Sequence, residues 1–121
     1  MTEIQNPKRY DLEDRTFQFA KNCRNFIKKL PKNISNNEYA KQLARSSGSQ
    51  AANYIEANES LSKKDFVMRV KICRKETKES RLWLNLCEIN NEKELEKEQG
   101  NLIKESTELM NIFGAIIRKS E

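Results

Sequence analysis

Four residues near the start of the chain have the types and the spacing of a surface that grips nucleic acid. Phe17, Lys21, Arg24 and Lys28 follow one another at steps of four, three and four residues, so in a helix they share one face. Such cations hold phosphates, and an unstacked base can lie on an exposed aromatic ring, as in the recognition of single-stranded RNA. The alternative is an ordinary solvated face, because lysine is common on the exterior of any helix.

A second basic run lies in the third quarter of the chain. Residues 61–90 carry 8 basic against 4 acidic side chains, as do residues 1–35, and the net charge is +5. This excess favours polyanionic partners, RNA or DNA, without proving one. The members of the second run that share a helical face are Lys64, Lys71, Lys75 and Lys78.

The same helical face continues into large apolar residues. Leu82, Leu86 and Ile89 keep the spacing of the basic run, and they lie opposite residues that we expect in the core. Because an exposed apolar strip usually marks a contact with a partner, we interpret this one as a subunit interface. Alternatively, the neighbouring turn or the start of the last helix covers it.

The composition argues against an enzyme. The chain has no histidine, so it lacks the commonest general base and the Glu-x-x-His pairs of di-iron bundles. It also has no GxxxxGK[ST] or GxGxxG segment for phosphates. The acidic run EKELEKE, residues 92–98, is spread around a helix and does not converge on one point. We therefore expect no catalytic residue, no metal site and no cofactor.

The cysteines do not form a recognisable framework. Cys23, Cys73 and Cys87 are odd in number and lack paired CxxC spacing, which argues against both disulfides and zinc. We expect three buried free thiols.

The elements that position these residues are predicted to be helices. A cap residue followed three positions later by an acidic side chain satisfies the first backbone N–H groups of a helix. This capping pattern occurs four times, predicting starts at Asp11 with Asp14, Ser35 with Glu38, Ser62 with Asp65, and Asn91 with Glu94. The first predicted helix ends at Pro31.

Behind three of these starts, core-type residues recur at alternating steps of four and three, as the buried face of a helix requires. The first helix carries Leu12, Thr16, Phe19, Cys23, Phe26 and Leu30 on that face. The third carries Phe66, Val70, Cys73, Thr77, Ser80 and Leu84. The fourth carries Leu95, Gln99, Leu102, Ser106, Leu109, Phe113 and Ile116.

The segment from Gln42 to Ala57 is rich in serine and alanine and could be a linker or a helix. We interpret it as a helix whose small side chains let neighbours approach, while Phe26, Phe66 and Phe113 fill the space. Gly48 is then a point of close contact. A linker would leave neither half with enough apolar surface to fold. The predicted buried face is Ala40, Leu43, Ala44, Ser47, Ala51, Tyr54 and Ile55.

These elements predict an all-α fold, an antiparallel up-down-up-down four-helix bundle. We expect a flexible segment over residues 1–10 and one domain over 11–121, because 121 residues suffice for a single core. No window approaches the roughly 18 apolar residues of a membrane span, and the first residues lack the apolar core of a signal peptide. We expect a cytoplasmic protein without membrane contact.

About half of the chain, from Phe26 to Leu86, resembles a known family. The segments that carry the resemblance are FIKKLPKNISNNEYAKQLARSSGSQAANYIEANESLSKKDF and ETKESRLWL. They are similar to the small four-helix-bundle proteins encoded in intervening sequences of bacterial 23S ribosomal RNA genes, and in turn to the accessory variability protein of diversity-generating retroelements. The matching positions are Gln42 and Arg45 in its QLRRA segment, Asn53 and Glu56 in its NIAEG segment, and Glu79 and Trp83 in its E-x-x-x-W-L segment.

The chain departs from the family pattern at Ala57, where the family usually has glycine. What the resemblance implies is a homo-oligomer, typically a ring-shaped pentamer, with a non-enzymatic accessory role. The implied partner is nucleic acid or a ribonucleoprotein, including a reverse-transcriptase-like or ribosomal protein. The alternative from a different class is a structural or adaptor oligomer that binds a protein partner and no nucleic acid.

The polar motif residues have structural interpretations as well. We expect Asn53 and Glu56 to form a cap on the turn from Asn58 to Leu61 or a cross-helix hydrogen bond. Glu79 could meet the indole N–H of Trp83 or the guanidinium of Arg45.

Overall fold

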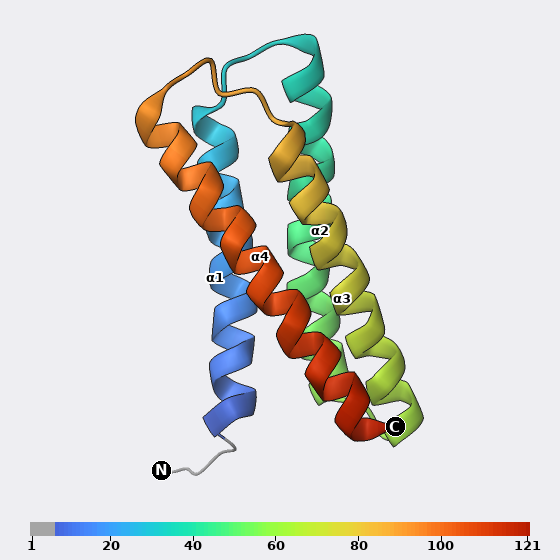
Figure 1. The fold of residues 1–121 in the computed structure, drawn as a ribbon. Coiled ribbons are helices and arrows are strands. Elements are labelled where there is room, and N and C mark those ends of the chain that lie inside the picture. The colour runs from blue at the N-terminus through green and yellow to red at the C-terminus, as the bar shows by residue number, and fades with distance from the viewer. Residues whose placement is uncertain (1–6) are drawn as a thin grey trace.

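The computed structural model describes residues 7–121, with side chains from Asp11 onward. Within this range the helices are α1 (Pro7–Lys29), α2 (Ile34–Asn58), α3 (Lys63–Leu86) and α4 (Lys93–Ser120), and there is no strand. The chain runs up, down, up and down (Figure 1), which confirms the predicted all-α antiparallel bundle.

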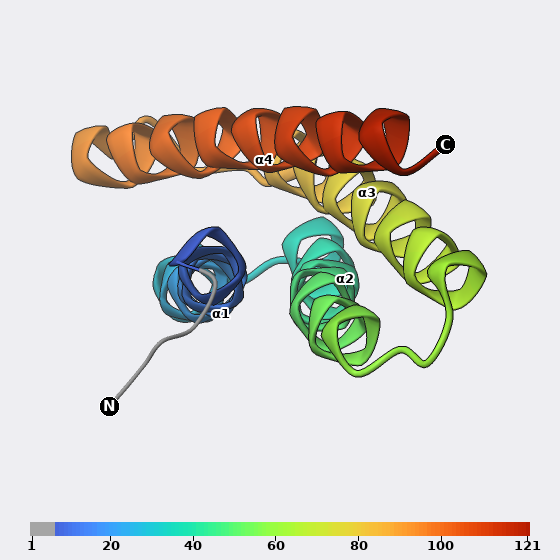
Figure 2. The ribbon, with the colours of Figure 1, turned by 90° about the horizontal axis from the view of Figure 1, so that it is seen from below.

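Each helix packs against its neighbours in the chain, and α4 closes the bundle by contacting α1. The packing is most extensive between α2 and α3 and least extensive between α1 and α4. Seen along α1, helix α4 lies across the top of the bundle and is not aligned with α1 (Figure 2). It starts beside the end of α1 and finishes near the start of α3 (Figure 1). As a result, α4 diverges from the N-terminal half of α1.

The core is built from the predicted faces of α1, α3 and α4. All six predicted α1 residues are buried, as are Val70, Cys73, Thr77, Ser80 and Leu84 of α3. On α4 the prediction holds from Leu95 to Phe113, although Gln99 is only partly buried. Ile117, not Ile116, is the fully buried residue at the end of α4. The largest fully buried side chains are Phe19, Phe26 and Phe113.

Helix α2 confirms that the serine- and alanine-rich segment is helical, but its predicted face is wrong in part. Ala44 and Ile55 are exposed, whereas Ser46 and Gln50 are buried. The cause is specific hydrogen bonding: Gln50 Nε2 donates to the Thr16 carbonyl oxygen at 2.8 Å. Since alanine and serine fit either side of a helix, the periodicity alone could not choose the buried side.

Gly48 also differs from its prediction. It is exposed, and a Cβ placed there would meet nothing within 4 Å. Gly48 is therefore not a close-contact point within the chain. The close approach of α2 to α3 lies instead at Ser46 and Ser80, whose Oγ atoms are 2.7 Å apart.

Only one of the four predicted helix starts is confirmed. Ser62 caps α3, and its Oγ accepts from the Asp65 backbone N–H at 3.1 Å. The cap of α2 is Asn33 rather than Ser35, and the Asn33 Oδ1 accepts from the Asn36 N–H at 2.8 Å. Either residue is a good cap chemically. The extended backbone of Asn33 places its side chain correctly.

The starts of α4 and α1 also differ from the predicted positions. Asn91 has a φ of 62°, a left-handed conformation, so the cap falls on the next residue, Glu92. Helix α1 is already helical at Pro7, the first residue described, so its start does not fall at Asp11. Residues 7–10 of the predicted flexible segment are thus helical, and residues 1–6 lie outside the described range.

Candidate functional site

The stripe of Phe17, Lys21, Arg24 and Lys28 is on the surface of α1, as the sequence predicted. The Phe17 side chain is 57% exposed, and the three cations are exposed as well. Among the side chains from Asp11 onward, none of these cations forms an ion pair with a carboxylate. Arg24 donates to the neighbouring Asn25 Oδ1, at 3.3 Å from Nη2. The stripe therefore carries uncompensated positive charge beside an exposed ring.

The stripe is held outward because the opposite face of α1 is fixed in the core. Phe19, Cys23 and Phe26 are at most 1% exposed. On one flank Thr16 accepts from Gln50 of α2, and on the other Arg15 is bound to Glu105 of α4. These contacts set the rotation of α1 about its axis.

The second basic run, on α3, is exposed but partly compensated. Lys71 Nζ lies 3.2 Å from Glu121 Oε2, and Lys75 Nζ lies 3.8 Å from Glu76 Oε2. Lys64 and Lys78 form no ion pair with the carboxylates that the structure describes. The α3 run thus offers less free charge than the α1 stripe.

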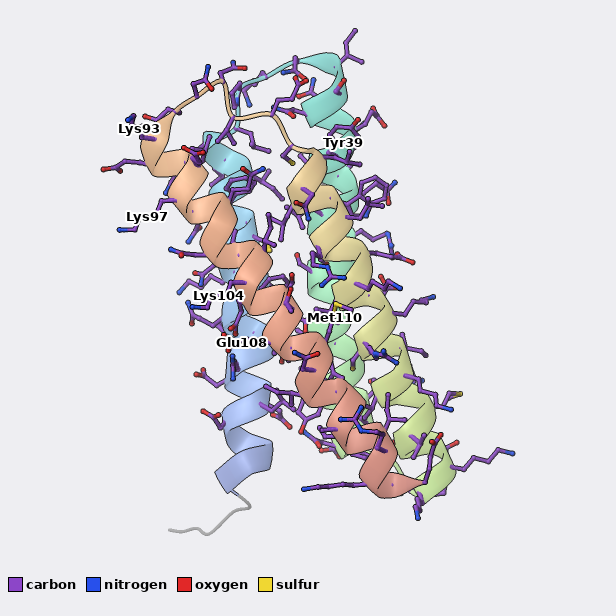
Figure 3. All side chains as sticks on the ribbon, in the orientation of Figure 1. Tyr39, Lys93, Lys97, Lys104, Glu108 and Met110 are labelled. Carbon is purple, nitrogen blue, oxygen red and sulfur yellow. The ribbon has the colours of Figure 1, made fainter. Side chains whose placement is uncertain are left out.

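Sequence reasoning missed a third cationic row, on α4. Lys93, Lys97 and Lys104 project from one side of this helix, and Glu108 lies on the same side (Figure 3). Their spacing of four and seven residues was a usable signal. It was hidden by the acidic residues between them, which also dilute the positive charge of this surface.

The predicted apolar strip is exposed at two of its three residues. Leu82 is 49% and Leu86 41% exposed on α3, and Met68 continues the same face toward the start of the helix. Ile89 is partly buried and packs against the core. The strip is therefore Met68, Leu82 and Leu86, and Ile89 does not belong to it.

The motif residues mainly join α2 to α3. Arg45 Nη2 lies 3.3 Å from both Glu76 Oε1 and Glu79 Oε1, which confirms the predicted contact with Glu79. Trp83 stacks on Tyr39 with ring centroids 6.1 Å apart. Its Nε1 is buried and has no hydrogen-bond partner in the described part of the chain, so the alternative contact with Glu79 is not formed.

Asn53 does not bind the turn after α2; it forms a cross-helix hydrogen bond, the other contact expected of it. Its amide nitrogen donates to the Ser49 carbonyl oxygen at 2.9 Å, while its Oδ1 accepts from Arg69 Nη1 of α3 at 2.9 Å. Gln42 and Glu56 are exposed. Asn53 therefore ties the two helices together one turn before the end of α2.

A cavity of about 530 Å³ lies where α4 diverges from α1. Its volume falls in the range of small-molecule sites. The guanidinium of Arg15 at its edge is engaged by Glu105 and Glu108. Hydrogen bonding to Glu105 raises the pKa of Arg15 above its already high ordinary value, so this side chain stays charged. The cavity is lined by Asp11, Leu12, Arg15, Tyr54, Asn58, Phe66, Ile112, Ala115, Ile116 and Lys119.

The thiols are buried and unpaired, as predicted. Burial raises the pKa of Cys23 to about 12 and that of Cys87 to about 11, so both remain protonated and weakly nucleophilic near neutral pH. Over the described residues, no group of His, Cys, Asp and Glu side chains has a metal-binding arrangement. None of the helices in residues 7–121 is long and apolar enough to cross a membrane.

Comparison with known proteins identifies relatives of this fold and sequence. A family model described as 23S rRNA-intervening sequence protein matches residues 8–115. A crystal structure of a protein of unknown function from the S23 ribosomal protein family of Bacteroides thetaiotaomicron is 29% identical and superimposes with a TM-score of 0.73. The match covers 87% of this chain and 96% of that protein. No curated protein matches the chain. The chain belongs to the 23S rRNA-intervening sequence protein family.

Proposed function

We propose that this protein is a non-enzymatic, cytoplasmic accessory protein that forms a homo-oligomer, with a pentameric ring as the expected form, and binds nucleic acid or a ribonucleoprotein. The α1 stripe is the principal contact, and Lys64, Lys71, Lys75 and Lys78 of α3 extend the basic surface. Single-stranded RNA is the expected ligand class, because the stripe combines cations with an exposed aromatic ring.

The observation that carries this proposal is the free charge of the α1 stripe. Some other cations, such as Arg15, Lys29 and Arg45, are bound to carboxylates. Lys21, Arg24 and Lys28 are exposed without such partners among the described residues. They are therefore available to phosphates, and a ring would present several copies of the stripe on one particle.

A second candidate function is favoured by the apolar strip. Met68, Leu82 and Leu86 are exposed on one face of α3, and such a surface suits a protein partner. In that case the protein would be an adaptor oligomer without nucleic-acid affinity. The two functions differ in their response to salt.

The test is charge reversal on two helices with equal change in net charge. We expect the triple variant Lys21→Glu, Arg24→Glu, Lys28→Glu to weaken binding to an unstructured single-stranded RNA by more than about tenfold, measured by fluorescence anisotropy. The slope of log affinity against log salt should fall by about 2, since each phosphate contact on a single strand contributes about 0.7. Phe17→Ala should weaken single-strand binding and leave duplex binding nearly unchanged.

The matched control reverses the α4 row with Lys93→Glu, Lys97→Glu, Lys104→Glu. We expect less than about a threefold loss there, because neighbouring carboxylates already dilute that surface. Equal losses in both triple variants would show that only net charge matters. Absence of RNA binding by the unaltered protein at low salt would favour the adaptor function.

A further inference from the structure

The proposed ring requires two different surfaces on every subunit. In a cyclic assembly with more than two members each contact is heterologous, so the patch given by one subunit differs from the patch that receives it. The apolar strip of α3 provides one patch. We propose that the outer face of α2, defined by Ala44, Gly48, Ala52 and Ile55, is the other, and that it receives the α3 strip of a second copy of this chain.

The outer α2 face is an unpartnered apolar surface. Its four residues follow at steps of four, four and three and are all exposed, with Ile55 52% exposed. Gly48 at its centre is unfavourable in a helix interior, and its surroundings within the chain are open. The fold of a single chain thus gives no reason for glycine at this position. A neighbouring helix packed on this face would give one.

The outer α2 face and the α3 strip overlap in position along the axis of the bundle. Within the chain α2 and α3 are antiparallel, and their register is fixed by three pairs: Ser46 with Ser80, Arg45 with Glu79 and Asn53 with Arg69. This register places Ala44 near the level of Leu82. By the same count, Ile55 lies near the level of Met68. If the ring axis runs along the bundle, surfaces at equal height meet, so Leu82 faces Ala44 and Met68 faces Ile55. Lys75 and Lys78 lie near the level of Gly48, and Leu86 lies beyond the N-terminal end of this α2 face.

The charges beside these apolar residues are complementary. The exposed carboxylate of Glu56 lies at the C-terminal end of the α2 face, whereas Lys64 and Lys71 lie at the N-terminal end of the α3 strip. The C-terminal end of α2 and the N-terminal end of α3 lie at the same end of the bundle, because the two helices are antiparallel (Figure 1). Opposite charges therefore meet when one copy docks beside the next, and this fixes their orientation.

The positions of the two faces also suit a closed ring. Helices α2 and α3 are neighbours in the bundle (Figure 2), so their outward faces point in different directions, as the two contact surfaces of a closed ring must. The α2–α3 edge then faces the centre of the ring. Helices α1 and α4 face outward, which leaves the α1 stripe accessible. Lys64, Lys71, Lys75 and Lys78 share the face of the strip, so in the ring they enter the subunit contact and the α1 stripe remains the contact for nucleic acid.

The experiment compares Gly48, which lies in the proposed subunit contact, with Gly100, which lies outside it. Gly48 and Gly100 are both exposed within helices, and a Cβ at either would meet nothing within 4 Å. We expect Gly48→Gln to convert the oligomer to single chains in light scattering coupled to size exclusion, while Gly100→Gln keeps the original mass. Both variants should keep their helical circular dichroism, because glutamine is a better helix former than glycine.

A mixing experiment tests the heterologous pairing itself. Gly48→Gln blocks the α2 face, and Leu82→Asp with Leu86→Asp blocks the α3 strip. Each variant alone should be monomeric, and an equimolar mixture should form a 1:1 dimer through the two intact faces. This inference depends on the proposed homo-oligomer, but the two fail differently. A monomeric unaltered protein would overturn both, whereas an intact ring in Gly48→Gln, dissociation of Gly100→Gln, or no dimer in the mixture would overturn only the α2–α3 contact.

Discussion

The α2–α3 pair and the α1–α4 pair are held together by different kinds of side chain. Between α2 and α3 the helices approach closely at small side chains, with two serine hydroxyls 2.7 Å apart, and the contact is extended by Asn53 with Arg69, by Arg45 with Glu79 and by the stacked rings of Tyr39 and Trp83. The buried faces of α1 and α4 instead carry large rings, Phe19 and Phe113, and the two helices are joined by the Arg15 ion pairs. The first pair has the most extensive backbone approach and the second the least.

This difference shows how one bundle combines close packing with an opening. Small residues let α2 and α3 approach along their length, so their relative position is fixed by backbone proximity and hydrogen bonds. Large residues keep α1 and α4 apart, and where α4 turns away they leave the cavity at Ile112 and Ile116. We therefore expect the two pairs to respond oppositely when side-chain volume is removed or added.

Removing volume from the core beside α4 should have the largest effect. Phe113 is fully buried and its ring lies 6.1 Å from that of Tyr54, centroid to centroid. We expect Phe113→Ala to lower the free energy of unfolding by about 3–5 kcal/mol, because it removes apolar burial and leaves a void next to an existing cavity. Urea denaturation followed by circular dichroism measures this.

The matched control is the same substitution on an exposed ring. Phe17→Ala removes an identical group from the surface of α1, and surface changes usually stay within about 0.5 kcal/mol. Comparable losses in the two variants would contradict the buried position of Phe113.

Adding volume should distinguish the two helix pairs at an intermediate cost. We expect Ser80→Leu to destabilise the protein by about 1–3 kcal/mol, because the larger side chain forces α2 and α3 apart and breaks the bond to Ser46. Ala115→Leu places a similar group in the wall of the cavity and should be tolerated within about 1 kcal/mol. Thermal denaturation of both variants provides the comparison, and a reversed order would show that the α2–α3 contact is the looser one.

The same contrast explains how much of the fold could be predicted from sequence. Faces marked by large apolar residues, such as Phe19, Phe26 and Leu109, were predicted correctly because only one side of the helix can bury them. The face of α2 was not, because its serines and alanines fit either side. The caps at Asn33 and Glu92 were missed because other good capping residues stand within two positions of them.

The candidate site was predictable in position but not in charge balance. Exposure of Lys21 and Lys28 follows from the helical period. The partial neutralisation of Lys71 does not, because its partner Glu121 lies fifty positions away in the sequence. The contact proposed for the outer face of α2 could not be predicted, because the sequence does not show whether Gly48 faces a neighbour in the chain, solvent or a second copy.

The smallest expected effect concerns two ion pairs, one from each helix pair. Arg15 bonds Glu105 at 2.7 and 2.8 Å with 31% of its side chain exposed, whereas Arg45 lies 3.3 Å from Glu79 and is 53% exposed. A double-mutant cycle with Arg15→Met and Glu105→Gln should give a coupling near 1 kcal/mol, the upper end for partly exposed pairs. The corresponding cycle with Arg45→Met and Glu79→Gln should give less than about 0.5 kcal/mol.

The dependence of these couplings on salt provides a second comparison of the two helix pairs. The α1–α4 coupling should decrease in concentrated salt, because the pair remains partly in contact with solvent. The weak Arg45–Glu79 coupling should also decrease, but the serine hydroxyls and close packing of α2 and α3 do not depend on ionic strength, so the total loss there should be smaller. Equal couplings in the two cycles would mean that the shorter distances at Arg15 add no stability. In that case the large buried side chains alone would hold α4 against α1, and the α1–α4 pair would differ from α2–α3 in side-chain size and not in the use of charge.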